Sequence, residues 1–454
     1  MNDLEKYIIS ESSLVKDALK KIEINQQGFI LIENSQNEIS SLATDGDIRS
    51  GLLNGITLDD FIYKIGNKDY FYGFEDTPHE VLLKKLDGNI KFIPILDQNK
   101  KLVTVLNKDS LPFKDESNVF YRSKSPVRIS FGGGGSDVSK YFSEYGGAVI
   151  NSTISLFSHA TLKINKNKKI RIFSLDLNDS IEFKNLISLK SSNNKSFSLI
   201  NSVISTINPS FGFDLYIRSD YPMSSGLGGS AVVSSAVIGC FNQLRIDKWN
   251  LYEISEIAFQ AERIQLQISG GWQDQYATVF GGFNFMEFNK NQNIIHPIRM
   301  PKNSLLELEQ SLILCYTGGN HDSGNIHEDQ AEQTKTIKTK DKIKDNVELT
   351  YKMRDYLLKG KLNKLGECLN ETWKIKRSLS SKISNKKLDQ IYSKALENGV
   401  VGGKLLGAGG GGYFLFYTNP FDRHKVMKWI EKENLIYTPF VFETNGLQSW
   451  TVRN

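Results

Sequence analysis

Cysteines, long apolar runs and an N-terminal leader pattern are scarce or missing in this chain of 454 residues. Its three cysteines, Cys240, Cys315 and Cys368, share no short spacing, which argues against a disulfide framework or a zinc site and favours a reducing compartment. No apolar run approaches the roughly 20 residues that a membrane span needs. The N-terminus shows no basic segment followed by an apolar core, the pattern of a secretory signal. We therefore expect a soluble, cytoplasmic protein with no membrane partner.

A large excess of charge is also absent. The net charge is +5, with 24% charged and 39% hydrophobic residues, as in an ordinary soluble globular protein. This mild positive balance lacks the footprint of a nucleic-acid-binding protein, and it suits an anionic small molecule. The length is sufficient for two or three domains, each with its own core.

Residues 1–112 consist of two similar halves. Each half has a helical stretch, a β-rich run, a turn and a second short strand, and the β-rich runs lie at 28–33 and 91–97. Internal repetition at about 60 residues suggests a paired module that packs on itself. The polar stretch 114–118 follows, and we expect a linker at 113–121.

Two segments of these halves resemble a known module. They are 44–49 (Thr-Asp-Gly-Asp-Ile-Arg) and 93–97 (Ile-Pro-Ile-Leu-Asp), and with them the region resembles a tandem CBS (cystathionine-β-synthase-type) domain pair, of the kind attached to sugar-nucleotide transferases. In such pairs a pattern like Thr44 and Asp47 holds the ribose of an adenine nucleotide, and the second half departs from it at 107–110. The resemblance implies at most one regulatory adenine-nucleotide site. A structural dimerisation module is the alternative, and CBS pairs make a homodimer plausible.

A glycine-rich turn lies between a strand-like run, 213–218, and a helix-like run, 232–244. It comprises 222–231 (Pro-Met-Ser-Ser-Gly-Leu-Gly-Gly-Ser-Ala). Its three glycines remove side chains where the chain turns, so backbone N–H groups can approach a ligand closely. The helix that follows directs its unpaired N–H groups and positive dipole end at the turn. This combination predicts an anion site, with phosphate as the first candidate.

A dinucleotide site is the first alternative, because 226–231 and 407–412 both satisfy the G-x-G-x-x-G/A fingerprint. That fold needs an acidic residue at the end of the next strand, and Asp247 has the distance but lies between two helical stretches. The second match precedes a strand, 413–417, where the fingerprint needs a helix. These contexts argue against a dinucleotide oxidoreductase. The sequence also contains no G-x-x-x-x-G-K-[ST] phosphate loop.

The next helix brings a carboxylate near the same turn. Asn250 is a plausible cap, with Glu253 at the third helical position. At 100° per residue Glu262 lies at the margin of an apolar stripe, so it is either a solvated boundary residue or a positioned ligand. Asp274 follows beside two glycines, Gly270 and Gly271. The stripe comprises Leu251, Ile254, Ile257, Ala258, Ala261 and Ile264.

Three motifs in one order identify a family. The segment 126–137 (Pro-Val-Arg-Ile-Ser-Phe-Gly-Gly-Gly-Gly-Ser-Asp) resembles the first motif of the GHMP kinases, 222–231 resembles the second, and 404–412 (Lys-Leu-Leu-Gly-Ala-Gly-Gly-Gly-Gly) resembles the third. Together they span residues 120–454. The chain is therefore identified as a member of the superfamily that includes galactokinase and the homoserine, mevalonate and phosphomevalonate kinases.

Three further segments, 146–151, 271–276 and 280–288, are most similar to the D-glycero-D-manno-heptose 7-phosphate kinases. The resemblance implies an ATP-dependent kinase that phosphorylates the anomeric hydroxyl of this sugar phosphate to the 1,7-bisphosphate, toward GDP-heptose for surface polysaccharide. That group usually carries a basic residue at the position of Trp272, whereas fucokinase domains carry Trp there. A fucokinase-like sugar 1-kinase is thus one alternative. A nucleotide-sensing binding protein with an inactive kinase domain is another.

The fold implied is α+β, in agreement with strands and helices that mix without strict alternation. The resemblance implies a CBS-pair module at 1–112. It places an ATP-binding domain resembling the second domain of ribosomal protein S5 at 122–305, and a ferredoxin-like C-terminal domain at 306–454.

Site roles follow from the resemblance together with the needs of phosphoryl transfer, which are in-line positioning and charge neutralisation. Ser230 and Glu262 would coordinate Mg²⁺, a hard ion that takes oxygen ligands. Asp274 would accept the proton of the sugar hydroxyl. Arg128 would stabilise charge on the transferred group. ATP would lie on Pro222, Ser225, Gly226, Leu227, Gly228, Gly229, Ser230 and Ala231. The sugar phosphate would lie near Asp137, Gly133, Gly134, Gly409 and Gly410.

Two more clusters leave alternatives open. His321 and His327 are six residues apart rather than at the i, i+4 spacing of a helical metal site, so the segment is a solvated loop or a loop that contacts the sugar or its phosphate. The lysine-rich run 335–342 is a solvated face or helps to hold a substrate phosphate.

Overall fold

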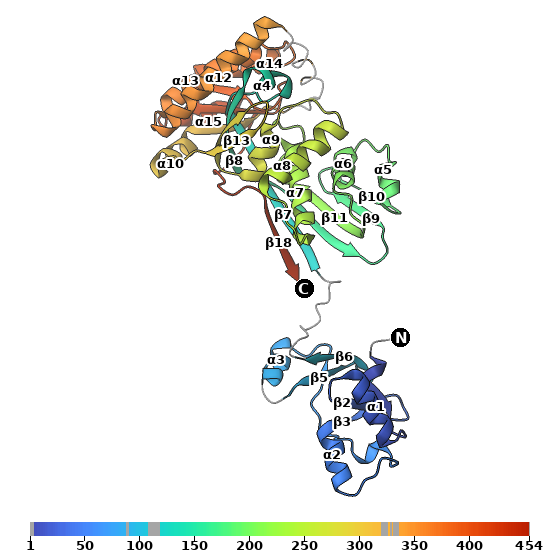
Figure 1. Ribbon diagram of the computed structural model, residues 1–454. Coiled ribbons are helices and arrows are strands. Elements are labelled where there is room, and N and C mark those ends of the chain that lie inside the picture. The colour runs from blue at the N-terminus through green and yellow to red at the C-terminus, as the bar shows by residue number, and fades with distance from the viewer. Residues whose placement is uncertain are drawn as a thin grey trace. The chain divides into compact units, whose positions relative to one another are not determined.

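The computed structural model describes residues 4–87, 90–107, 119–318, 326, 329 and 336–453. Its contacts divide the chain into two compact units, Met1–Asp115 and Glu116–Asn454 (Figure 1). Several features singled out in the sequence lie outside the described residues: the polar stretch 114–118, the segment 108–110, His321, His327 and Lys335.

The first unit contains the repeat that the sequence predicted. In each half the second strand pairs in parallel with the first and antiparallel with the third. The first half has η1 (Glu5–Tyr7), β1 (Ile8–Ser10), α1 (Val15–Asn25), β2 (Phe29–Glu33), β3 (Ile39–Thr44) and α2 (Asp45–Leu53). After η2 (Ile62–Lys64), the second half has β4 (Gly73–Phe74), α3 (His79–Asp87), β5 (Phe92–Leu96) and β6 (Leu102–Asn107).

The two halves pack on each other through β2. Because side chains alternate along a strand, Ile30 and Ile32 pack with α1 on one face, while Phe29 and Leu31 are buried on the other. The rings of Phe29 and Phe92 stack with centroids 3.6 Å apart. The module therefore packs on itself, as the repeat suggested.

The second unit is built on an eight-stranded sheet with the order β10-β9-β11-β8-β12-β13, to which β7 is added beside β8 and β18 beside β7. Its pairs are antiparallel except β9 with β11, which is parallel. The strands are β7 (Val119–Gly132), β8 (Gly147–Asn165), β9 (Ile170–Ser174), β10 (Asp179–Phe183), β11 (Gly212–Ser219), β12 (Phe283–Phe288), β13 (Asn293–Pro297) and β18 (Gln448–Arg453).

Helices pack on this sheet around α7 (Gly229–Leu244), which is buried along most of its length. It contacts both β7 and β8, and α8 and α9 lie beside it. The other elements are α4 (Ser139–Tyr145), α5 (Leu186–Lys190), α6 (Ser198–Ile207), α8 (Leu251–Phe259), η4 (Gln260–Gln265) and α9 (Gln273–Phe280). The buried α7 thus fixes the glycine turn that precedes it against the centre of the sheet.

A second, four-stranded antiparallel sheet has the order β15-β16-β14-β17. Its strands are β14 (Leu312–Tyr316), β15 (Val400–Leu405), β16 (Tyr413–Thr418) and β17 (Ile436–Tyr437). The helices of this part are α10 (Lys302–Ser311), α12 (Ile337–Leu358), α13 (Leu362–Arg377), α14 (Lys386–Glu397) and α15 (Arg423–Lys432). The unit is thus a mixed fold of helices and sheets.

Two of the expected boundaries require correction. Residues 119–121, expected in the linker, belong to β7 and pair with β18. The expected division between 305 and 306 falls within α10. Near the end of the chain, β18 pairs with β7 of the eight-stranded sheet (Figure 1). The C-terminal domain is therefore not the continuous segment 306–454. None of the helices in the described part of the chain has the length and apolar character to cross a bilayer.

Candidate active site

A cavity of about 600 Å³ lies in the second unit where the three glycine motifs meet. Its lining residues include members of β7, the turn before α7, η4, α9, α13 and β15. Predicted site residues that line it are Arg128, Gly134, Asp137, Ser225, Gly226, Gly228, Gly229, Ser230, Glu262 and Asp274. Those that do not line it are Pro222, Leu227, Ala231, Gly133, Gly409 and Gly410.

The glycine turn leads directly into α7. Gly228, at the N-cap position, has a φ of 79° and Gly226 a φ of 81°, a region that favours glycine. No side chain caps the helix, so its first N–H groups are left for a ligand. Leu227 and Ala231 are instead buried in the protein interior, which explains why these two motif residues do not line the cavity.

The loop of the third glycine motif packs directly against the backbone of this turn. A Cβ on Gly412 would lie 2.4 Å from the Ser225 carbonyl oxygen, so the two loops approach closer than side chains allow. Gly409 and Gly410, expected at the substrate, instead pack on Ile383: a Cβ on Gly409 would lie 2.8 Å from its Cα, and the Gly410 N–H donates to its carbonyl. Gly409 is therefore needed for backbone packing, and Gly410 is held by a backbone hydrogen bond.

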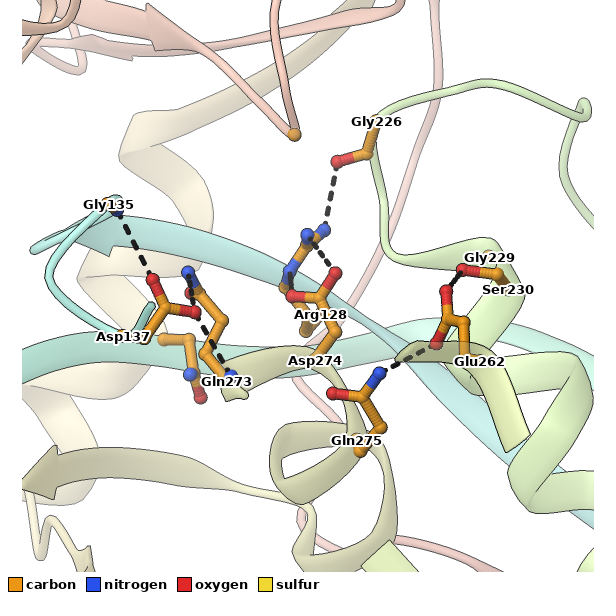
Figure 2. A network of polar contacts seen from close by, with 12 residues as sticks. Arg128, Gly135, Asp137, Gly226, Gly229, Ser230, Glu262, Gln273, Asp274 and Gln275 are labelled. Carbon is orange, nitrogen blue, oxygen red and sulfur yellow. Dashed lines mark hydrogen bonds and ion pairs between the residues drawn. The ribbon is translucent and has the colours of Figure 1, made fainter. Parts of the chain in front are cut away.

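An ion pair of Arg128 and Asp274, which both line the cavity, lies at the centre of the polar network in Figure 2. The Arg128 Nε and Nη2 donate to the two carboxylate oxygens at 2.9 and 2.8 Å, and Nη1 donates to the Gly226 carbonyl at 2.9 Å. A bidentate guanidinium–carboxylate pair is strong and fixes the geometry of both groups. Arg128 therefore connects β7, the glycine turn and α9 at one point.

On one side of this pair, Ser230 donates to the Oε1 atom of Glu262 (Figure 2). Gln275 Nε2 donates to Oε2 at 2.6 Å, and Arg263 Nη1 lies 3.5 Å from Oε1. Glu262 is only 1% exposed. Burial of a carboxylate is costly unless it is hydrogen-bonded or paired, and here both oxygens have partners.

The position of Glu262 differs from the sequence expectation of a stripe margin. Residues 260–265 form a π-helical turn, η4, so the 100° spacing does not hold there. Leu251 and Ile264, both assigned to the stripe, are exposed, at 42% and 64%. The expected capping box of Asn250 and Glu253 is present. The π-helical turn therefore brings Glu262 to the cavity.

Ser230 and Glu262 fit a magnesium ion. A hydroxyl and a carboxylate are hard oxygen donors, and Mg²⁺ is commonly held by one or two carboxylates together with substrate phosphates. Within the described ranges, no group of three or more His, Cys, Asp or Glu side chains gathers as a metal site. A magnesium ion here would thus depend on phosphate oxygens and water for its other ligands.

On the other side of the pair lies Asp137, 3% exposed. Its Oδ1 accepts from the Gly135 N–H at 3.2 Å, and its Oδ2 accepts from the Gln273 N–H at 3.1 Å and from Nε2 at 3.2 Å (Figure 2). Burial raises the pKa of Asp137, and the charge of Asp274 raises it further. A Cβ on Gly271 would lie 1.9 Å from Oδ2, so the glycine there is required by the carboxylate.

Trp272 is not among the residues that line the cavity. Its ring stacks on Phe259 with centroids 3.5 Å apart, and Nε1 donates to Ser139 Oγ at 2.9 Å. Its backbone N–H donates to the Asp137 carbonyl at 3.1 Å. The side chain on which the fucokinase alternative rested thus packs outside the cavity lining, and it is the backbone of Trp272 that contacts Asp137.

Two lysines that were assigned no role also line the cavity. Lys404, the first residue of the third motif, is 3% exposed, and burial lowers its pKa to about 7, with a further lowering from Arg128. Lys376 donates to the Leu405 and Gly407 carbonyls, and burial lowers its pKa well below the ordinary value. A lysine inside an apolar strand was the sequence signal for Lys404.

Thr44 and Asp47 lie in the first unit and form hydrogen bonds to each other. Thr44 is the N-cap of α2: its N–H and Oγ1 donate to Asp47 Oδ2 at 2.8 and 2.6 Å, and the Asp47 N–H donates back to Oγ1 at 3.2 Å. This capping box explains both residues structurally. A nucleotide bound here would have to use the same Thr44 and Asp47 side chains that form the helix cap.

Two family models match the chain. The model described as the GHMP kinases N terminal domain matches residues 196–282, and the one described as GHMP kinases C terminal matches 353–427. The first match includes the glycine turn and both Glu262 and Asp274, and the second includes the third motif.

Individual proteins agree with these models. The chain is 34% identical over 337 residues to a D-glycero-alpha-D-manno-heptose 7-phosphate kinase of Campylobacter jejuni, covering 73% of this chain and 99% of that protein. It is 25% identical to an Arabidopsis thaliana bifunctional fucokinase/GDP-fucose pyrophosphorylase, over 67% of this chain but 30% of the relative. A solved D-glycero-D-manno-heptose 1-phosphate kinase from Bacteriodes thetaiotaomicron has a TM-score of 0.62 and 28% identity, covering 74% of this chain and 100% of its own.

Proposed function

This chain belongs to the GHMP kinases and transfers a phosphoryl group to a sugar hydroxyl, and we propose that its acceptor is D-glycero-D-manno-heptose 7-phosphate. ATP would be the donor and the anomeric hydroxyl the acceptor, which gives the 1,7-bisphosphate. The product would serve synthesis of a GDP-activated heptose for surface polysaccharide. Identity of 34% to the Campylobacter jejuni kinase supports this substrate over other sugars.

One observation carries the proposal: Asp274 and Arg128 lie between two different sets of groups in one cavity. Figure 2 shows Ser230 and Glu262 on one side of the pair and Asp137 on the other. The first side, with the N-terminus of α7, suits a triphosphate. The second side suits sugar hydroxyls, and the pair between them lies where a hydroxyl would meet a terminal phosphoryl group.

We assign each residue of the site one role in the proposed reaction. Asp274 accepts the proton of the anomeric hydroxyl as its oxygen attacks phosphorus, and ADP leaves. Arg128 holds the Asp274 carboxylate in place and adds positive charge beside the transferred group. Ser230 and Glu262 would hold Mg²⁺, which would supply positive charge to neutralise the phosphate oxygens. The backbone N–H groups of 226–229 hold those oxygens from the other side.

A fucokinase-like activity is the alternative acceptor specificity, and Trp272 was its main support. Because the Trp272 ring stacks on Phe259 outside the cavity lining, it gives no direct contact by which to prefer fucose. A nucleotide-sensing protein without transfer activity is the alternative of another class. The pairing of Arg128 with Asp274 and of Ser230 with Glu262 supports an active enzyme instead.

The experiment that tests the function is a screen of ATP consumption over free sugars and sugar 7-phosphates with Mg²⁺ present. Phosphorus NMR of the product then identifies the phosphorylated position. We expect turnover with the heptose 7-phosphate and a new anomeric phosphate. Turnover with fucose alone would favour the alternative specificity, and no ATP consumption with any acceptor would favour the binding protein.

For the first unit we propose a CBS-type regulatory module, with an adenine nucleotide at Thr44 and Asp47. The strand repeat supports a paired module, while the capping box supplies a structural reason for the same two residues. Adenosine nucleotides should then change the rate of the full chain at saturating substrates, and a chain lacking 1–112 should lose this response. An identical response in the shorter chain would contradict the proposal.

A further inference from the structure

The acceptor side of the cavity contains buried polar groups that have no partner. Among the described residues, the Lys404 ammonium has no hydrogen-bond or ion-pair partner, although Lys404 is 3% exposed. The hydroxyls of Ser130 and Thr372 are buried and also without a partner. All three residues line the cavity. Buried atoms without a partner also line the cavity at Arg263, Gln273 and Asn346. Since buried polar groups are nearly always satisfied, this concentration of unpartnered atoms indicates a missing ligand.

The charge of this region indicates the kind of ligand. Lys404, Lys376 and Arg128 lie near enough to one another that each of the other cations lowers the pKa of Lys376. Arg128 is paired with Asp274, but the partners of Lys376 are carbonyl oxygens, which carry only partial charge. The lowered pKa of Lys404 and of Lys376 means that their charged forms are disfavoured unless an anion lies beside them. The ligand should therefore be an anion.

The location separates this anion from the triphosphate. The charges that act on Lys404 are those of Arg128 and Asp137, whereas Ser230 and Glu262 lie on the opposite side of the Arg128–Asp274 pair (Figure 2). The orphan groups come from α13 and β15, which pack together, and from β7. Thr372 and Lys376 are four residues apart on α13 and so share one helix face. Lys404 is thus within reach of the Asp137 charge, on the side where we propose the acceptor to bind.

We propose that Lys404, Thr372 and Ser130 form a subsite for the phosphoryl group that the acceptor sugar already carries. The subsite rests on the proposed function for the identity of the sugar, but its chemistry is that of a phosphate monoester. Lys404 supplies the charge, the two hydroxyls donate hydrogen bonds to phosphate oxygens, and Lys376 adds charge while holding the carbonyls of the third motif. The enzyme would select phosphorylated acceptors over free sugars.

The test compares wild type with Lys404→Met and Lys404→Arg in the full chain. The acceptors are D-glycero-D-manno-heptose 7-phosphate and the same heptose without phosphate. For Lys404→Met we expect kcat/KM with the phosphorylated acceptor to fall at least about 30-fold, the effect of removing one partner of a buried charge pair. The values for the free heptose and the KM for ATP should change less than about threefold. Lys404→Arg should restore part of the loss.

A matched loss with both acceptors, together with a raised KM for ATP, would instead assign Lys404 to the transferred phosphoryl group and overturn the proposal. Unchanged kinetics would overturn it too. Because burial disfavours the charged form of Lys404 in the ligand-free protein, as its lowered pKa indicates, Lys404→Met should melt at the same or a higher temperature near pH 7, which separates lost binding from lost folding. Thr372→Val should give the same acceptor selectivity with a smaller effect.

Calorimetric titration of the protein with heptose 7-phosphate in the absence of ATP tests the phosphate subsite independently of the kinase reaction. Binding that depends on Lys404, with no turnover, would retain the subsite and reject the kinase reaction on this sugar. Turnover of the phosphorylated sugar with equal binding to wild type and Lys404→Met would retain the kinase and reject the subsite.

Discussion

Gly226 and Gly407 meet backbone to backbone: a Cβ on Gly407 would lie 2.5 Å from the Gly226 Cα. This contact joins the second and third glycine motifs. The turn that faces the predicted triphosphate is therefore shaped by a loop that follows β15, 181 positions further along the chain (407 minus 226). A change in that loop should therefore alter the ATP site through the backbone of the glycine turn, without a direct contact to ATP.

Gly407→Ala should destabilise the protein and weaken ATP binding. Gly407 has a φ of 64°, and its added methyl group would meet Gly226 backbone. We expect a loss of about 2 kcal/mol or more in the free energy of unfolding, since the left-handed conformation alone costs an alanine about 1–2 kcal/mol. Denaturant unfolding and the KM for ATP measure the two effects. Gly134→Ala is the control for stability, because a Cβ there meets no atom within 4 Å; equal unfolding of both variants would contradict the steric argument.

Asp274→Asn should lower kcat by about 10²–10⁴-fold, the usual contribution of a general base, while ATP binding survives. The amide cannot accept the proton from the sugar hydroxyl, and single-turnover kinetics with calorimetric ATP titration separates the two effects. Asp214→Asn is a matched control, because Asp214 pairs with Arg171 through two bonds of 2.8 Å, and Asp214 and Arg171 are not among the cavity-lining residues. Near-normal turnover in Asp274→Asn would mean that another group accepts the proton.

Glu262→Gln should raise the Mg²⁺ concentration needed for half-maximal rate, because a neutral amide is a poor ligand for a hard ion. We expect a shift of about tenfold or more, as magnesium sites with few protein ligands lose most of their charge with one carboxylate. Initial rates across a magnesium series at fixed ATP measure it. Glu253→Gln, on the neighbouring helix, changes the capping box and should leave the magnesium dependence unaltered. An equal shift in both variants would point to general destabilisation.

Trp272→Phe should leave acceptor selectivity unchanged. A phenyl ring can keep the stack on Phe259, and only the hydrogen bond from Nε1 to Ser139 is lost, at a cost of about 1 kcal/mol in unfolding free energy. The measurement is the ratio of kcat/KM for heptose 7-phosphate and for fucose, together with the melting temperature. A large change in that ratio would show that residue 272 contacts the sugar during turnover.

Lys404 should make stability depend on pH in a defined window. Its pKa is about 7 in the folded chain, against 10.5 for an ordinary lysine. Between these values the unfolded state binds more protons, so stability rises with pH by up to about 1.4 kcal/mol per unit. Below the lower value both states are protonated and the effect ends. The difference in unfolding free energy between wild type and Lys404→Met should therefore shift in favour of wild type from pH 7 to pH 9. A constant difference would mean that Lys404 titrates normally.

Local features of the fold could be predicted from the sequence. The capping box of Asn250 and Glu253, the start of α7 after the glycine turn and the repeat in the first unit depend on residues that are close in sequence. The three motifs also predicted the family that the comparisons support. The remaining differences concern contacts between distant segments, for example the pairing of β18 with β7.

By itself the sequence indicated the reaction class, because three of its motifs resemble those of the GHMP kinases and stand in the same order. Only the tertiary structure decided which of these residues meet. The π-helical turn brought Glu262 into the cavity, close loop packing took Gly409 and Gly410 away from it, and Lys404 gained its significance from its burial beside Arg128. The physical reason is that burial and charge proximity depend on how strands and helices from distant parts of the chain pack, which no local pattern specifies.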